Sequence, residues 1–318
     1  MKRLQRLRAS AQIRDMVSEV GFGVANLIQP LFVVEGLTAT APIPGLDGNI
    51  RHTIDSLKSQ IARDLAQGVN HFILFQVPRE KGARGFSNEF AAMAIRAVKE
   101  EFRDDLTLWL DTCLCAVTES GHCCLYGGEG RQDLEGTLTE LRAMALHYAQ
   151  AGADGISPSD MNDGRVAAIR SALDGGGFEW LPVMSYSTKF ASNFYGPFRV
   201  AADSAPKHGD RKQYQLDVRN RRDAIASSVR CAEEGADLLM VKPGLSSIDL
   251  IRPIAEVTGK PVGAYQVSGE YAGLQLLARE GLIDFDAGLL ETWHTLRRAG
   301  ASYIITYGAR LARGLGLP

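Results

Sequence analysis

Short apolar runs rich in β-branched residues recur along the chain, and a stretch with helical periodicity follows each run. In those stretches apolar residues return every three or four positions, so each has one apolar face that can pack on a sheet. Strands that alternate with helices are typical of parallel strands joined by helical crossovers. The pattern predicts eight strands, at residues 30–34, 70–77, 107–111, 154–159, 181–187, 237–242, 261–267 and 301–307.

Four joints between a predicted helix and the next strand share one local pattern. They read AQGVNHFILF, QAGADGISPS, EEGADLLMVK and RAGASYIITY. In each, a helix end is followed by a glycine suited to the left-handed conformation and then by a buried strand. Eight such units predict a (β/α)8 TIM barrel, whose catalytic groups lie at the C-terminal ends of the strands. The alternative is an open doubly wound sheet, but no GxGxxG motif follows the first strand.

Two segments fall outside the alternating pattern. Residues 1–28 precede the predicted barrel, which spans residues 29–318, and they contain Lys2, Arg3, Arg6, Arg8 and Arg14 as well as a short amphipathic stripe. We interpret them as an oligomerisation arm, the alternative being a solvated, frayed tail. The second segment, from Phe198 to Gln215, is long, polar and irregular, and its place after the fifth strand predicts a lid over the barrel mouth.

Composition and charge exclude several classes of protein. The 318 residues are 45% hydrophobic and 23% charged, as in a globular protein with a substantial core. A net charge of -2 provides no electrostatic footprint for nucleic acid. No apolar run approaches the roughly 18 residues of a membrane span, and no apolar segment follows the basic N-terminus. We therefore expect a cytoplasmic protein that binds a small molecule and neither nucleic acid nor a membrane.

Two lysines stand where predicted barrel strands end. Lys242 closes the buried run ADLLMVKPG, and Lys189 follows the fifth strand in SYSTKFAS. A lone lysine at a strand end is more often solvated, but burial and a second cation nearby lower the pKa of an ammonium group. A neutral amine can attack a ketone to form a Schiff base, so the pair indicates imine chemistry. Further polar residues at strand ends are Asp111, Ser159, Asp160, Ser268 and Tyr307.

Four of the five cysteines lie within twelve residues, in DTCLCAVTESGHCC. This spacing favours a metal site or reactive thiols over a disulfide framework. Cys113 and Cys115 share one side of an extended segment, and Cys123 returns after a loop. Three thiolates and one open position form a zinc site of the catalytic type; the alternative is a set of buried, unreactive cysteines. We leave His122 out of the ligand set, because a histidine directly before a ligating cysteine more often points away.

The predicted lid carries Arg199 and Arg211. A guanidinium group matches a carboxylate in bidentate geometry, so two arginines on a lid suit a substrate with a carboxylate. The alternative is a pair of surface salt bridges.

Several longer segments form a highly specific set: DTCLCAVTESGHC, SPSDMNDGRVAAIR, MSYSTKFASNFYGPFR, GDRKQYQLD, NRRDAI, GADLLMVKPG and GAYQVSGEYA. Together they resemble the porphobilinogen synthase family, also called δ-aminolevulinic acid dehydratase, over nearly the whole chain. The resemblance implies a TIM barrel with an N-terminal arm, commonly assembled as a homo-octamer. It also implies a lyase that condenses two molecules of 5-aminolevulinate to porphobilinogen, with loss of two waters, in tetrapyrrole and heme biosynthesis.

The resemblance implies a role for most of the polar residues named above. Lys242 matches the lysine that forms a Schiff base with the first substrate, and Lys189 matches a lysine that forms a second imine or acts as a base. The remaining matches are Ser268 and Tyr307 for the carboxylate of the first substrate, Arg199, Arg211 and Gln215 for that of the second, Asp111 and Ser159 near the reacting amines, and Cys113, Cys115 and Cys123 for zinc.

The chain departs from the family pattern near the predicted site, at Val117, Ser120, Cys124, Asn162 and Gly244. In addition, Ser227 stands where magnesium-stimulated members carry a glutamate, which argues against an allosteric Mg²⁺ site. The alternatives are a divergent paralogue that condenses a related amino ketone and a noncatalytic ligand- or metal-binding relative. From the residues alone, a class I aldolase with a single required lysine is a further alternative.

Overall fold

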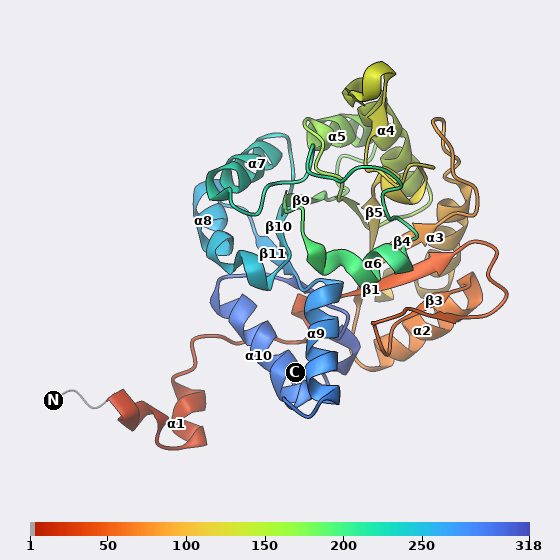
Figure 1. The fold of residues 1–318 in the computed structure, drawn as a ribbon. Helices are drawn as coiled ribbons and strands as arrows, with labels where there is room; N and C mark the ends of the chain where they lie inside the picture. Colours follow the sequence, from red (N-terminus) through yellow and green to blue (C-terminus); the bar gives the residue numbers. More distant parts are fainter. Residues whose placement is uncertain (1–3) are drawn as a thin grey trace.

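A computed structural model describes residues 4–318, and its centre is a barrel of parallel strands surrounded by helices (Figure 1). Hydrogen-bonded neighbours follow the order β8-β5-β4-β1-β12-β11-β10-β9. A parallel bridge between Ile156 and Val183 brings the two ends of this series together. The strands are β1 (Leu27–Val34), β4 (His71–Val77), β5 (Thr107–Thr112), β8 (Gly155–Pro158), β9 (Met184–Lys189), β10 (Leu238–Lys242), β11 (Val262–Tyr265) and β12 (Ile304–Ile305). The predicted (β/α)8 barrel is confirmed.

Helices cover the outside of the barrel. They are α2 (Ile54–Ala66), α3 (Glu89–Phe102), α4 (Leu134–Gln150), α5 (Arg165–Gly175), α7 (Arg221–Glu233), α8 (Ile248–Thr258), α9 (Ser268–Arg279) and α10 (Phe285–Arg298). Their apolar stripes pack on the sheet, as in α2, where Leu57 and Ile61 are fully buried. None of the helices within residues 4–318 is both long and apolar enough to cross a membrane.

Shorter strands and turns lie between the main elements. Short strands β2 (Ala41–Pro42) and β3 (Ile50–His52) pair antiparallel beside β1, and β6 (Leu125–Tyr126) pairs with β7 (Gln132–Asp133) in a separate sheet. Single 3-10 turns cover Leu4–Arg8, Val24–Asn26, Arg103–Asp105, Leu114–Ala116, Gly128–Gly130, Asn193–Tyr195, Leu245–Ser247 and Ala309–Leu311.

The four repeated joints adopt the conformation that the sequence predicts. Their glycines, Gly68, Gly152, Gly235 and Gly300, have φ between 85° and 106°. This is the left-handed region, which a side chain with a Cβ atom rarely adopts. The repeat therefore marks one αβ joint that the fold uses four times.

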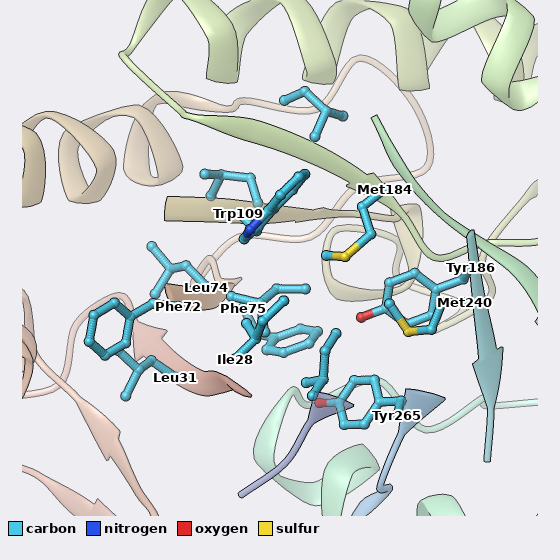
Figure 2. Close-up of a cluster of buried hydrophobic side chains, with 14 of the residues drawn as sticks. Ile28, Leu31, Phe72, Leu74, Phe75, Trp109, Met184, Tyr186, Met240 and Tyr265 are labelled. Atoms are coloured by element: carbon cyan, nitrogen blue, oxygen red, sulfur yellow. The ribbon is translucent and has the colours of Figure 1, made fainter. Parts of the chain in front are cut away.

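Large apolar side chains fill the interior of the barrel. Figure 2 shows Trp109, Met184, Tyr186, Met240 and Tyr265 converging from β5, β9, β10 and β11. Each of them is at most 7% exposed. Because this layer closes the centre of the barrel, the polar residues at the C-terminal strand ends form the wall of a mouth above it.

Strand ends differ in detail from the sequence prediction. β9 extends to Lys189, two residues beyond the predicted end, and its register pairs Lys189 directly with Lys242 on β10. A bulge between Leu239 and Val241 shifts the register on the way. β1 starts at Leu27 rather than Pro30, because Leu27 and Ile28 pair with β12.

A short helix, α1 (Ala11–Met16), stands apart from the barrel in Figure 1 and has no buried residue. Lys2 and Arg3 of the predicted arm lie outside the described residues. The prediction of an irregular lid from Phe198 was wrong at its beginning, because Phe198 lies within α6 (Gly196–Ala201), which has Pro197 in its first turn. Proline is tolerated in the first turn, where its missing N–H has no helical partner. In Figure 1, α6 lies across the centre of the barrel.

Candidate active site

The two lysines of the sequence prediction lie side by side at the mouth, and both are buried. The Nζ atom of Lys242 lies over four aromatic rings, at 4.0 Å from the centre of Tyr265, 4.8 Å from Tyr186, 5.0 Å from Phe198 and 5.4 Å from Tyr195. Burial, and then the positive charge of Lys189, hold the pKa of Lys242 well below its ordinary value. The site therefore favours the neutral amine, which is the nucleophilic form.

Lys189 is held by the neighbouring strand end. Its Nζ donates a hydrogen bond to the main-chain oxygen of Ser159, which follows β8. The same Nζ lies 5.7 Å from the centre of the Tyr186 ring, so this ring faces both amines.

Asp111, on β5, provides a carboxyl group close to both lysines. Burial raises the pKa of Asp111 to about 6, against the opposing effects of a hydrogen bond from Ser159 and of the charges of Lys189 and Lys242. A carboxyl group with a pKa near neutrality can both take up and release protons under ordinary conditions.

The three predicted metal ligands come together beside the lysines. The sulfur atoms of Cys113, Cys115 and Cys123 lie within 4.8 Å of one another, and all three side chains are buried. Among residues 4–318, no other group of three or more histidines, cysteines or acidic residues is placed to hold a metal ion. Hydrogen bonds from the other two thiols lower the pKa of Cys123 well below its ordinary value, so the cluster favours an anionic sulfur.

His122 lies outside this cluster of sulfur ligands. Its Nε2 lies 2.8 Å from His208 O, and its Nδ1 lies 3.0 Å from the hydroxyl oxygen of Tyr214. A carbonyl oxygen only accepts, so Nε2 carries the proton and Nδ1 accepts from the tyrosine. The same hydroxyl oxygen accepts from the main-chain N–H of Cys123 at 3.2 Å. Tyr214 thus ties the cysteine loop to the segment after α6.

Asn162, one of the departures from the family pattern, contacts the main chain of the loop that contains Cys123. Its Nδ2 donates to the main-chain oxygen of Cys123 at 2.9 Å and to a carboxylate oxygen of Asp160. Asp160 in turn faces the guanidinium group of Arg165 at 3.4 Å, and both side chains are fully buried. A chain of polar contacts therefore links the main chain of Cys123 to the ion pair of Asp160 and Arg165.

The segment after α6 closes on the cysteine loop through Arg211. Its Nη2 donates to Gly121 O at 2.9 Å and also to Ser204 O. Gly121 has φ of +69°, and a Cβ atom there would lie 2.3 Å from Ala205 O. The two segments approach so closely that only glycine fits at this position.

Arg199 lies at the end of α6, with its guanidinium carbon 6.0 Å from the centre of the Tyr195 ring. Burial, and then the nearby charge of Arg211, lower the pKa of Arg199. Two cations brought this close, in a partly buried place, suit an anionic group between them.

The other predicted contacts of substrate carboxylates line the same mouth. Ser268 begins α9, and its hydroxyl accepts from Phe198 N at 3.1 Å. Ser268 therefore binds the main chain of α6. The hydroxyl of Tyr307 accepts from the hydroxyl of Tyr265 at 3.3 Å. Gln215 is buried, and neither its Oε1 nor its Nε2 has a hydrogen-bond partner.

Glu270 is a residue that the sequence analysis missed. One carboxylate oxygen accepts from Leu245 N at 2.9 Å and the other from Val267 N at 2.8 Å. Burial raises the pKa of Glu270 to about 7. It thereby fastens the turn after Lys242 to the start of α9, where Ser268 lies. The signal in the sequence was a glutamate three residues after Val267, which precedes α9, in the position of the glutamate of a capping box.

The fold and these residues define a class: a barrel enzyme with two lysines, a carboxyl group and a cluster of three thiols at the C-terminal ends of its strands. The family model for Delta-aminolevulinic acid dehydratase matches residues 1–314. The chain therefore belongs to the delta-aminolevulinic acid dehydratase family.

Curated relatives and solved structures agree with this family. The delta-aminolevulinic acid dehydratase of Halalkalibacterium halodurans is 45% identical over 313 residues, which cover 97% of this chain and 95% of the relative. The Helicobacter pylori protein of the same name is 40% identical over 97% of each chain. A crystal structure of the enzyme from Toxoplasma gondii, in complex with the reaction product porphobilinogen, has a TM-score of 0.95 and 38% identity over 99% of this chain and 91% of that one.

Proposed function

We propose that this chain condenses two molecules of 5-aminolevulinate to porphobilinogen, with loss of two waters, as a hydro-lyase of tetrapyrrole biosynthesis. The observation that carries the proposal is the pairing of two buried amines, Lys189 and Lys242, on adjacent strands beside a cluster of three thiols. The family, and the product bound to the Toxoplasma gondii relative, support it.

Lys242 is the group we assign to the first substrate. Its neutral amine attacks the ketone carbon, a C–N bond forms, and the carbonyl oxygen becomes a hydroxyl group. That oxygen then leaves with a proton as water, and an imine remains. The aromatic rings around Nζ exclude water, which favours dehydration over hydrolysis of the imine.

Lys189 and Asp111 serve the second substrate and the proton transfers. Lys189 either forms a second imine or acts as a base, and its contact with Ser159 O directs its Nζ toward the mouth. Asp111, with its pKa raised to about 6, accepts protons from the carbon and nitrogen atoms that must lose them during condensation.

The substrate carboxylates are held at two places. Ser268 and Tyr307 bind the carboxylate of the first substrate, from α9 and from the end of the strand after α10. Arg199, Arg211 and Gln215 bind that of the second, and all three belong to the segment that covers the mouth. Their position on this segment couples substrate binding to exclusion of water.

Cys113, Cys115 and Cys123 fit a zinc ion, since three buried thiols with sulfur atoms within 4.8 Å of one another leave one position open for a water or a substrate. Bound there, zinc would hold the amino group of a substrate and polarise its ketone. Tyr214 and Asn162 orient the ligands by binding the main chain of Cys123. At the position of the family's magnesium ligand, the hydroxyl of Ser227 donates to Ser187 O instead, and we assign no magnesium site.

We also propose that the chain acts in the cytoplasm as a homo-oligomer, an octamer by family resemblance. Of the predicted arm, residues 1–28, the part around α1 would bind a neighbouring subunit, because α1 has no buried residue, whereas Leu27 and Ile28 belong to β1.

A turnover assay tests the proposed function. Purified protein is incubated with 5-aminolevulinate, with and without a chelator, and porphobilinogen is measured. We expect product that disappears with the chelator and returns with added zinc. Folded, zinc-loaded protein that forms no product would overturn the assignment in favour of a divergent relative.

A further inference from the structure

Several buried polar atoms around the mouth have no hydrogen-bond partner. A buried polar group without a partner is rare in a folded protein and calls for an explanation, which at a catalytic site is commonly a missing ligand. The atoms in question are Asp111 Oδ1, Arg199 Nε, Arg211 Nε, Gln215 Oε1 and Nε2, and the hydroxyl oxygen of Tyr186. All but the last belong to residues to which a role in the proposed function is already assigned.

Tyr186 lies on β9, the strand that ends with Lys189, and is fully buried. Its ring centre is 4.8 Å from Lys242 Nζ and 5.7 Å from Lys189 Nζ. Figure 2 shows its hydroxyl group directed into the interior of the barrel.

Comparison with the other tyrosines around Lys242 sets Tyr186 apart. The hydroxyl of Tyr195 donates to Phe190 O at 2.8 Å, and that of Tyr265 donates to the Tyr307 hydroxyl at 3.3 Å. Among residues 4–318, three tyrosine rings lie within 6 Å of Nζ, and only that of Tyr186 has a hydroxyl group without a partner. A phenylalanine would fill the same space without burying an unpaired polar atom, so packing alone does not account for the hydroxyl.

We propose that Tyr186 is a further catalytic residue, whose hydroxyl donates a hydrogen bond to the substrate oxygen that leaves when Lys242 forms its imine. This inference rests on the proposed function. Attack by the amine moves negative charge onto the ketone oxygen, and a fixed donor in a site without water stabilises that charge. Burial raises the pKa of Tyr186 well above its ordinary value, so the hydroxyl stays protonated and remains a donor at neutral pH.

The step is balanced without any further reactant. The C–N bond forms as the C=O π bond opens, and the proton lost by the attacking nitrogen passes to the oxygen. The C–O bond then breaks as the C=N bond forms, the second proton of the nitrogen joins the leaving hydroxyl, and water departs. Tyr186 donates a hydrogen bond throughout and ends with its own proton.

The test isolates imine formation from condensation. The probe is 4-oxopentanoate, which is 5-aminolevulinate without its amino group, so it can form the imine but has no amine for ring closure. Samples of protein and probe are reduced with borohydride at successive times, and peptide mass mapping measures the adduct on Lys242. For Tyr186→Phe we expect the rate of adduct formation to fall roughly 100-fold, as for the loss of one donor to a developing oxyanion. The thermal midpoint should stay the same or rise, since no hydrogen bond is lost.

Tyr303→Phe is the matched control. The hydroxyl of Tyr303 is also buried, but it donates to Leu239 O at 2.7 Å. We expect this variant to lose thermal stability and to form the adduct at the wild-type rate. A Tyr186→Phe variant that forms the adduct at the wild-type rate would overturn the inference alone. Wild-type protein that forms no adduct on Lys242 would overturn the inference together with the imine step of the proposed function.

Discussion

The Nζ atom of Lys242 lies 4.0 Å from the centre of the Tyr265 ring. The negative face of an aromatic ring attracts a cation, yet burial and the charge of Lys189 prevail and lower the pKa of Lys242. The site thus favours the neutral, reactive amine over the ammonium form. Because the pKa of Lys242 is lower in the folded protein than in the unfolded chain, this lysine lowers the free energy of unfolding at pH values below its unfolded-state pKa.

Replacement of Lys242 should separate activity from stability. Lys242→Met keeps the length and removes the amine, so turnover should fall by about 10³-fold or more. The thermal midpoint should rise by about 2–4 °C, because a buried, ionisable group is replaced by an apolar one. Calorimetry and the porphobilinogen assay measure the two effects. Lys212→Met, at a side chain that is 75% exposed, should change neither, and a destabilised Lys242→Met would contradict the expected cost of burying the amine.

The cysteines allow a sharp test of the metal site. Cys115→Ala should lose bound zinc and most activity, whereas Cys124→Ala should keep one zinc per chain, because Cys124 is buried beside the cluster but is not part of it. Zinc is measured by atomic emission after dialysis against metal-free buffer. Equal zinc content in the two variants would show that the three clustered thiols are not the ligands.

The contact between the cysteine loop and the lid predicts an effect on substrate binding. In Gly121→Ala, the new methyl group would meet Ala205 O at 2.3 Å, so the lid must shift and KM for 5-aminolevulinate should rise at least about tenfold, which corresponds to about 1.4 kcal/mol. Gly209→Ala is the control, because Gly209 also has a positive φ of +57° but has open space around its Cβ position. Steady-state kinetics of the two variants should therefore differ. A similar rise of KM in both variants would mean that backbone strain at a positive φ causes the rise, rather than the contact with Ala205 O.

Asp111 predicts the acidic side of the pH profile. Its pKa is raised to about 6, so below this pH the carboxyl group is protonated and no longer accepts a proton, and kcat/KM should fall as the pH drops through about 6. Asp111→Asn should be much less active and should lack this inflection. An unchanged inflection in the variant would assign it to another group.

The raised pKa of Asp111 also predicts that the free energy of unfolding falls as the pH rises, whereas the activity should increase with pH over the same range. Its folded-state pKa lies above the ordinary value of 3.8, so the folded protein binds this proton more tightly than the unfolded chain. Its contribution to the free energy of unfolding is fully present below pH 3.8 and is lost as the pH rises through about 6. Denaturant titrations of wild type and Asp111→Asn across this range measure the difference, which should shrink in the variant.

The architecture could be predicted from sequence because its signals are local and repeated. The glycines at the four αβ joints, for example Gly68 and Gly235, occupy the left-handed conformation that the repeat indicates. The mouth could be predicted as well, since barrel topology brings the ends of all strands to one side. Lys189 was expected just beyond its strand and lies within it, because strand ends depend on pairing with the neighbouring strand.

The contacts that complete the site could not be predicted in this way. Tyr214 meets His122 and Glu270 meets Leu245 across long separations in sequence, and no local pattern marks such pairs. The environment of Tyr186 depends on which neighbouring hydroxyls already have partners. That is a property of the packed barrel, which hydrophobic periodicity does not report.

The register that pairs Lys189 with Lys242 fixes the distance between the main-chain positions of the two amines. Adjacent strands lie about 4.8 Å apart, a span of a few carbon–carbon bonds, so the two lysines start from main-chain positions within reach of each other. The separation of the main-chain atoms that carry the two lysines is then set by the hydrogen bonds between β9 and β10. Enlarging the pocket walls would leave that distance unchanged, whereas removing the bulge between Leu239 and Val241 would shift Lys242 along β9 and end its direct pairing with Lys189.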